Sequence, residues 1–194
     1  MNARSVLRGA ALLGGALAVG ALSAAGRGRE LDEEAFRAAN RERGPATDRL
    51  LVGVTELGSI WASLGAAAVI AAAGRRRAAV RGLAAASLAW LAGQGLKRVF
   101  DRPRPSDVNP EGTNRRIRRP NGSSWPSSHP AVLSAFSTVA ADELDAKPSA
   151  RLVLDALAGT VGASRLYLGV HYPADVVGGL LLGRAVASLF DERR

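Results

Sequence analysis

Long uncharged runs of Ala, Leu, Val and Gly alternate with short charged connections along most of this chain. The first run, from Gly9 to Gly26, contains 18 residues without a charge. About 20 apolar residues are enough for a helix to cross the apolar core of a bilayer. The run is therefore predicted to be a transmembrane helix. A cleaved secretory signal peptide is the alternative, because Ser23-Ala24-Ala25 has the small residues of a cleavage site.

Five further apolar runs predict five further helices, and the last three reach membrane length only if flanking residues extend them into a protein-lined cavity. Gly179 and Gly183 lie four residues apart, a spacing that lets helices approach closely. The pattern predicts one all-α domain over residues 1–194, an integral-membrane bundle of about six transmembrane helices. The five further runs are Leu50 to Gly74, Ala78 to Leu96, Pro130 to Ala141, Arg151 to Ser164 and Val176 to Phe190.

Residues 27–49 carry mixed charge, with acids early and arginines late. This order suits a short helix, because acids are favoured at a helix N-terminus and bases at its C-terminus. The helix is expected to end at Gly44-Pro45. It is expected either to lie in the membrane interface or to be a solvated linker helix. Residues 1–48 are thus predicted to form an N-terminal helix and an interfacial segment.

A polar segment of 33 residues, Lys97 to His129, interrupts the apolar runs. Its first 23 residues hold eight basic and three acidic side chains, which is +5 of the chain's net charge of +9. Pro103, Pro105 and Pro110 disfavour a helix there. The segment is predicted to be a loop that binds an anion.

Composition narrows the classes of partner. Nucleic acid is not expected despite a pI near 11.3, because the bases lie between apolar runs and only 5% of residues are aromatic. The chain has no cysteine, which excludes disulfides and thiolate sites. No acidic pair or histidine cluster has metal-ligand spacing, so no metal site is predicted from the spacing.

The arginines also predict an orientation. With a cytoplasmic N-terminus, three basic clusters lie inside, as the positive-inside rule asks: Arg75 to Arg77, Lys147 with Arg151, and Arg193-Arg194. The basic loop then lies outside, where a phosphorylated ligand would explain its charge. The inverted orientation explains the loop but leaves the three clusters unexplained.

The two histidines of the chain both stand at helix boundaries. His129 closes Pro126-Ser127-Ser128-His129 and opens a helix, whose unpaired N-terminal amides attract anions. Asp175 follows His171 by four residues and can accept its Nδ1 proton, which leaves Nε2 as an oriented nucleophile.

Together these residues resemble the three-part signature of the type 2 phosphatidic acid phosphatase superfamily, in order and in spacing. The first part, K-x6-R-P, is Lys97-RVFDRP-Arg104-Pro105. The second is Pro126-Ser127-Ser128-His129, with Ser128 where the family usually has Gly. The third is Ser164-Arg165-LYLGV-His171-YPA-Asp175, so that the catalytic motifs cover residues 97–175.

The resemblance implies a role for each motif residue. His171 is expected to attack phosphorus and become phosphohistidine, with Asp175 orienting it. His129 is expected to protonate the leaving group and then to activate water. The phosphoryl oxygens are expected to bind five residues, with Ser128 contributing its backbone amide: Lys97, Arg104, Ser127, Ser128 and Arg165. These cations replace the metal that kinases use, so no cofactor is implied.

The expected function is a bacterial lipid phosphate phosphatase that acts on a phosphorylated membrane lipid at the extracytoplasmic face. An undecaprenyl or decaprenyl pyrophosphate or monophosphate is favoured, followed by phosphatidic acid and phosphatidylglycerol phosphate. A lipid-linked phosphotransferase and a non-catalytic lipid-binding module are the alternatives, and the oligomeric state stays open. Arginines outside the motif positions are expected to meet solvent or headgroups: Arg98, Arg102, Arg115, Arg116, Arg118 and Arg119.

Overall fold

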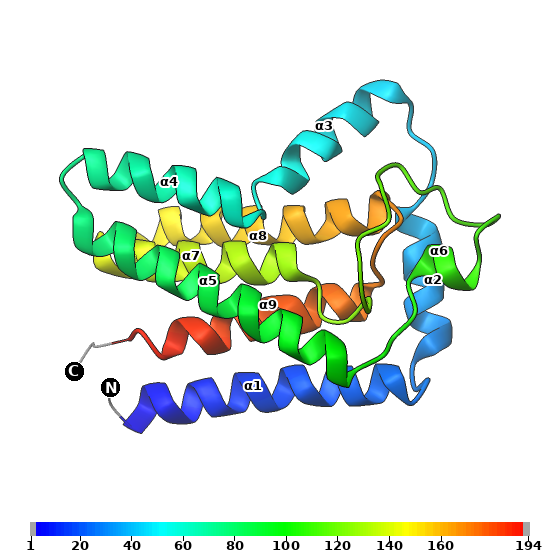
Figure 1. Cartoon of the computed structure of the whole chain (residues 1–194), viewed down its shortest axis with the longest axis horizontal. Coiled ribbons are helices and arrows are strands. Elements are labelled where there is room, and N and C mark those ends of the chain that lie inside the picture. Colours follow the sequence, from blue (N-terminus) through cyan, green and yellow to red (C-terminus); the bar gives the residue numbers. More distant parts are fainter. Residues whose placement is uncertain (1–2, 192–194) are drawn as a thin grey trace.

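The computed structural model describes residues 3–191, which form helices and loops without a strand (Figure 1). The predicted all-α class is confirmed for these residues. Arg193 and Arg194, the third basic cluster of the predicted orientation, lie outside the described residues. The helices are α1 (Ala3–Ala24), α2 (Arg29–Ala39), α3 (Pro45–Glu56), α4 (Ile60–Ala72), α5 (Arg76–Val99), α6 (Pro105–Val108), α7 (Ser128–Glu143), α8 (Pro148–Tyr167) and α9 (Pro173–Ser188).

Helix α7 forms the centre of the bundle, with most of its residues buried against α4, α5, α8 and α9. Small side chains allow this packing: Ala131, Ala135 and Val139 share one apolar cluster with residues of α5 and α9. A Cβ atom at Gly179 or Gly183 would collide with backbone carbonyl oxygens at the start of α7. The two glycines therefore bring α9 against α7, as their spacing predicts.

Helix α1 lies along α9 and belongs to the packed bundle (Figure 1). A Cβ atom at Gly20 would lie 2.8 Å from the ring of Trp125, which is fully buried. The opposite side of α1 is exposed, with Leu7 69% accessible. The first apolar run thus packs through small residues on one face and presents aliphatic side chains on the other.

The predicted helix from Leu50 to Gly74 is wrong as a single element, because α3 and α4 meet at an angle of 63°. A Cβ atom at Gly58 would lie 2.8 Å from Cβ and the carbonyl oxygen of His129, so the chain passes close to the start of α7 here. Ser59 then caps α4 by accepting a hydrogen bond from the amide of Ala62 at 3.0 Å. The break therefore follows from tertiary contact and a local cap.

The number of membrane spans remains a prediction. Among residues 3–191, α1 alone has the length and hydropathy of a span, and α3 with α4 would qualify if the bent pair counted as one. Helices α7 and α9 have 16 residues each, short of the roughly 20 needed to cross a bilayer.

Helix α2 ends at Ala39, with Asn40 as its C-cap, before the predicted Gly44-Pro45, and it packs on the bundle rather than forming a solvated linker. Phe36 is buried and packs edge-on against Tyr172, with ring centroids 5.4 Å apart. Asn40 donates hydrogen bonds to the carbonyl oxygens of Leu166 and Tyr167. These contacts attach α2 to the connection between α8 and α9.

The two ends of the bundle differ (Figure 1). One end gathers the α4–α5 and α7–α8 connections and both described chain ends. The other end holds α2, the long polar loop with α6, and the α8–α9 connection. All three sequence motifs meet at this second end.

Candidate active site

The nucleophile candidate His171 lies in the connection between α8 and α9 and is only 2% exposed. Its Nδ1 atom is 3.4 Å from Oδ2 of Asp175, in the first turn of α9, without hydrogen-bond geometry. Its Nε2 atom is 3.4 Å from Nη1 of Arg104. The ring thus directs one nitrogen toward the carboxylate and the other toward a motif cation.

Asp175 is held from several sides at once. The backbone amide of Tyr172 donates to its Oδ2 atom at 2.8 Å, and the Ser124 hydroxyl donates to the same atom. Arg102 donates from Nη1 to Oδ1 at 2.6 Å. The carboxylate is completely buried, so these donors replace the water it would otherwise bind.

Arg102 is not a solvent or headgroup contact, which corrects the sequence interpretation. Its side chain is 9% exposed and also pairs through Nη2 with Asp32 of α2. The guanidinium lies over the ring of Tyr172, 4.5 Å from the ring centroid. The arginine-proline repeat of the first motif was a signal for Arg102, whereas nothing in the sequence indicated that Asp32 reaches the site.

Arg104 lies in a cradle of backbone carbonyl groups. Its guanidinium donates to the carbonyl oxygens of Val170 at 2.8 Å and Ser123 at 3.0 Å, and more weakly to those of Asn121 and Gly122. Burial lowers the pKa of Arg104 to about 10, which still keeps it charged at neutral pH. The loop therefore fixes this cation beside His171.

Lys97, at the end of α5, binds the loop before α7 that Arg104 also contacts. Its Nζ atom donates to the carbonyl oxygens of Ser123 at 2.9 Å and Pro126 at 2.8 Å. Two of the three motif cations thus bind the same short loop, Ser123 to Pro126, which leads into α7. This shared anchoring explains why the first and second motifs come together.

Arg165, in the last turn of α8, is 3% exposed. Its Nη1 atom donates to the hydroxyl of Thr55 on α3 at 2.9 Å. Its Nε atom is buried with no hydrogen-bond partner among the described residues. Arg165 therefore has donor capacity left for a ligand, and sequence reasoning did not foresee Thr55 beside it.

Ser127 is the N-cap residue of α7, yet its hydroxyl makes no capping bond and has no partner among the described residues. Its backbone amide donates to the carbonyl oxygen of Asp175 at 2.9 Å. The hydroxyl of Ser128 is 3.4 Å from Nε2 of Gln94 on α5, so α5 accommodates the side chain that replaces the usual glycine. The start of α7 thus offers unpaired donors, the feature that makes a helix N-terminus an anion site.

His129 completes the set in the first turn of α7, where it is half-buried beside Gly58. It interacts electrostatically with Arg165 and Lys97. His171 interacts in the same way with Lys97, Arg104 and Asp175. All predicted site residues are therefore at one end of the bundle: Lys97, Arg104, Ser127, Ser128, His129, Arg165, His171 and Asp175.

Burial governs the protonation of the nucleophile candidate. It holds the pKa of His171 well below its usual value of 6.5, so the ring is neutral at neutral pH. A neutral imidazole has a free lone pair on one nitrogen, which nucleophilic attack requires.

Two of the loop arginines expected to attract headgroups form ion pairs within the chain. Arg116 stacks on Tyr167, pairs with Asp48 at 2.8 Å and donates to the carbonyl oxygen of Tyr167 at 2.6 Å. Arg119 forms a two-pronged pair with Asp107 at 2.7 Å. Arg115 and Arg118 are exposed and keep the predicted role as an expectation.

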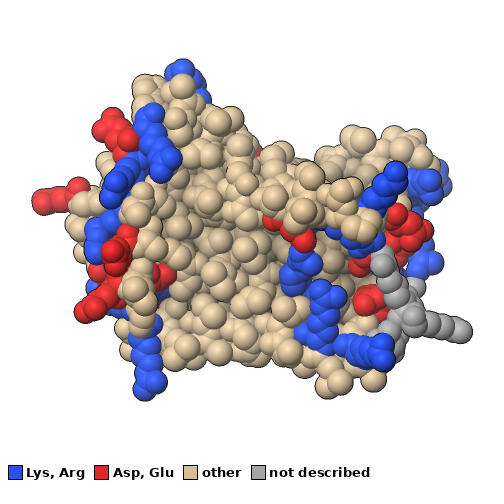
Figure 2. All heavy atoms as spheres, turned by 180° about the vertical axis from the view of Figure 1, so that it is seen from behind, with Lys and Arg blue, Asp and Glu red and all other residues tan. Residues whose placement is uncertain are grey.

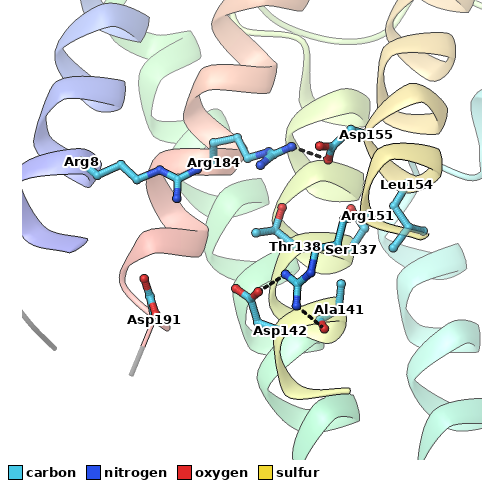
Figure 3. Close-up of a pocket in the computed structure, with 10 residues that line it drawn as sticks. All are labelled: Arg8, Ser137, Thr138, Ala141, Asp142, Arg151, Leu154, Asp155, Arg184 and Asp191. Atoms are coloured by element: carbon cyan, nitrogen blue, oxygen red, sulfur yellow. Dashed lines mark hydrogen bonds and ion pairs between the residues drawn. The ribbon is translucent and has the colours of Figure 1, made fainter. Parts of the chain in front are cut away.

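A separate polar cavity of about 300 Å³ lies between α1, α7, α8 and α9, near the C-terminal end of α7 (Figure 3). Arg151 pairs there with Asp142, and Arg184 pairs with Asp155. The residues that line this cavity include neither of the two histidines, and none of them belongs to the three motifs. These ion pairs hold the helices together at the end opposite to the candidate active site.

Comparison with known proteins agrees with this arrangement. The model of the PAP2 superfamily matches residues 77–190, which include all three motifs. The chain belongs to the PAP2 superfamily. PAP2 is the abbreviation for the type 2 phosphatidic acid phosphatase superfamily, so the match confirms the resemblance drawn from the motifs.

One curated relative of this chain is the decaprenylphosphoryl-5-phosphoribose phosphatase of Mycolicibacterium smegmatis, with 39% identity over 120 residues. The match covers 61% of this chain and 62% of that protein. The chain therefore aligns with about three fifths of the length of this relative.

Two solved structures share the fold. A transmembrane phosphatidylglycerolphosphate phosphatase from Bacillus subtilis has a TM-score of 0.80 and 24% identity, covering 94% of each chain. LpxE from Aquifex aeolicus has a TM-score of 0.72 and 28% identity, covering 82% of this chain and 94% of its own. These similarities and the exposed apolar α1 are consistent with a membrane location.

Proposed function

We propose that this chain is a lipid phosphate phosphatase that works through a phosphohistidine and needs no metal ion. The observation that carries the proposal is the meeting of His171, Asp175 and His129 with three motif cations in one buried site. Unpaired donors on Ser127 and Arg165 support a phosphate ligand there, because buried donors without a protein partner are rare.

The reaction has two steps. Nε2 of His171 forms a bond to phosphorus while the ester P–O bond breaks, and the leaving oxygen takes a proton from His129. Water then attacks the phosphohistidine, gives its proton to His129, and the P–N bond breaks to release inorganic phosphate. Lys97, Arg104 and Arg165 stabilise the charge on the phosphoryl oxygens in both steps, which is electrostatic catalysis.

The substrate class is a membrane lipid with a polyprenyl chain and a terminal phosphate. The curated relative acts, by its name, on a decaprenyl lipid that carries a phosphorylated ribose. A lipid-linked sugar phosphate therefore joins the polyprenyl monophosphates and pyrophosphates as a leading candidate, ahead of phosphatidic acid.

The chain crosses the membrane several times, with its active site outside the cytoplasm. Figure 2 shows charged side chains gathered toward the two ends, with a broad uncharged band between them. The basic connections at Arg75 to Arg77 and at Lys147 with Arg151 lie at the end away from the site, as expected for the cytoplasmic side.

The test is phosphate release by the purified full chain in detergent, with EDTA present. The substrates are decaprenylphosphoryl-5-phosphoribose, a polyprenyl pyrophosphate, a polyprenyl monophosphate and phosphatidic acid, and His171→Ala is the blank. We expect release from at least one polyprenyl substrate that EDTA does not reduce and that the variant lacks. Appreciable turnover by His171→Ala would exclude the nucleophile, and a strict need for divalent metal would exclude the mechanism.

A further inference from the structure

Four ionisable side chains form a continuous chain from α2 to the reacting histidine. Asp32 pairs with Nη2 of Arg102, whose Nη1 donates to Asp175, and Asp175 faces Nδ1 of His171. The exposed fractions of the side chains of Asp32, Arg102 and Asp175 are 10%, 9% and 0%. Interactions between charges this buried are screened weakly by water.

We infer that Asp32 and Arg102 are positioning residues for the nucleophile: Arg102 fixes the Asp175 carboxylate, and Asp32 offsets the arginine's charge so that Asp175 remains an effective anion toward His171. This inference rests on the proposed function and adds to it a contribution from α2. Helix α2 lies outside residues 77–190, which the family model matches.

The charges explain why a second carboxylate is useful. When Nε2 bonds to phosphorus, a ring that keeps its Nδ1 proton becomes positively charged. Arg102 alone would cancel the charge of Asp175, whereas Asp32 restores a net charge of −1 to the group of three. The other charged groups that act on His171 are Lys97 and Arg104, and both oppose a positive ring.

Backbone contacts show that Asp32 also holds the scaffold. Its Oδ1 atom accepts a hydrogen bond from the amide of Ala174 at 2.8 Å, in the first turn of α9. That amide is one of the donors a helix N-terminus leaves unpaired. The same carboxylate thus fixes both Arg102 and the helix that carries Asp175. An Asp32→Asn variant keeps an oxygen for the amide of Ala174 while removing the charge.

The first experiment compares Asp32→Asn with Glu34→Gln, an exposed acid on the same helix, using the full chain and farnesyl phosphate in detergent. We expect Asp32→Asn to lower kcat about 10- to 100-fold with little change in KM, a loss of the size found when the supporting partner of a metal-bound histidine is removed. Glu34→Gln should match the unmodified chain. Equal kcat values for the two variants would overturn the inference.

The second experiment measures coupling. In an Arg102→Gln background, the Asp32→Asn change should alter kcat less than about threefold, because Asp32 acts through Arg102. A loss as large as in the unmodified chain would show that Asp32 acts without Arg102 and would overturn the inference.

The third experiment does not depend on activity. Only two histidines are present, so isotope-labelled histidine gives one set of ring signals from each. The set that disappears in His129→Gln belongs to His129, and the other set belongs to His171. Replacing Arg102 by glutamine should raise the pKa of His171 by about one unit or more, because the guanidinium then no longer offsets the charge of Asp175. The comparison leaves the other titratable side chains of the site the same in both proteins: Lys97, Arg104, His129, Arg165 and Tyr172. An unchanged or lowered pKa would refute the electrostatic role.

The two proposals can fail separately. If His171→Ala is inactive while Asp32→Asn retains full kcat, the phosphatase mechanism stands and the positioning role is refuted. If His171→Ala retains turnover, the proposed function fails, whatever the NMR titration gives.

Discussion

Replacing Ser127 by alanine should separate activity from stability, because the Ser127 hydroxyl has no partner among the described residues. A serine at a helix N-cap usually stabilises the helix by bonding a free amide, but this one makes no such bond. A buried hydroxyl without a partner costs about 1–3 kcal/mol. Ser127→Ala should therefore leave the free energy of unfolding unchanged or raise it by about 1 kcal/mol.

Activity should change in the opposite direction. A hydrogen bond to a charged acceptor contributes about 1.5–3 kcal/mol. If the hydroxyl donates to a phosphoryl oxygen in the transition state, its loss lowers kcat/KM about 10- to 150-fold, since 1.4 kcal/mol corresponds to a factor of ten. The variant would thus be as stable as the unmodified chain and much less active.

The assay pairs thermal unfolding in detergent with phosphate release, and Ser188→Ala is the matched control. The Ser188 hydroxyl is also buried in a helix but donates to the carbonyl oxygen of Ala185 at 2.6 Å, away from the site. Losing that bond should cost about 1 kcal/mol, or about 2–4 °C in Tm, and should leave kcat/KM unchanged. A Tm loss in Ser127→Ala equal to that of Ser188→Ala, or a kcat/KM within twofold of normal, would refute the reasoning.

Two further predictions concern pH and packing. Because burial lowers the pKa of His171 below 6.5, the unfolded chain binds more protons below that pH, and stability should fall by up to about 1.4 kcal/mol per pH unit as pH drops below 6.5 toward the folded-state pKa. Between pH 7 and pH 5.5, the free energy of unfolding should therefore decrease less for His171→Gln than for the unmodified chain. Equal decreases would contradict the lowered pKa of His171. Gly179→Ala should destabilise the bundle by about 1–3 kcal/mol, because its Cβ atom would meet the Ser127 carbonyl oxygen. Gly159→Ala on α8, which has open space, should stabilise it by up to about 1 kcal/mol, and similar Tm shifts for both would argue against close α7–α9 contact.

The local parts of the site were predictable from the sequence. Asp175 faces His171 because four residues place them around the start of one helix, and Ser127 meets the N-terminus of α7 because it immediately precedes that helix. The spacing of Gly179 and Gly183 likewise predicted the close approach of α9 and α7. Each inference needs only the geometry of one helix and its flanking residues.

The break between α3 and α4 was not predictable in the same way. A long, largely apolar run indicates a continuous helix, and the close passage of Gly58 beside His129, together with the Ser59 cap, explains why the chain bends there. Apolar periodicity indicates that a segment is buried in protein or membrane, whereas a bend depends on the tertiary contacts that the segment makes.

The sequence by itself determined the all-α class, the three motifs and thereby the family, since these depend on composition and on short spacings along the chain. Only the tertiary structure decided which residues support the motifs. Arg102 meets Asp32 across 70 residues, and Arg165 meets Thr55 across 110. A charge on a helix looks the same in a sequence whether it faces water or a buried partner, because its environment is created by segments far away in the chain.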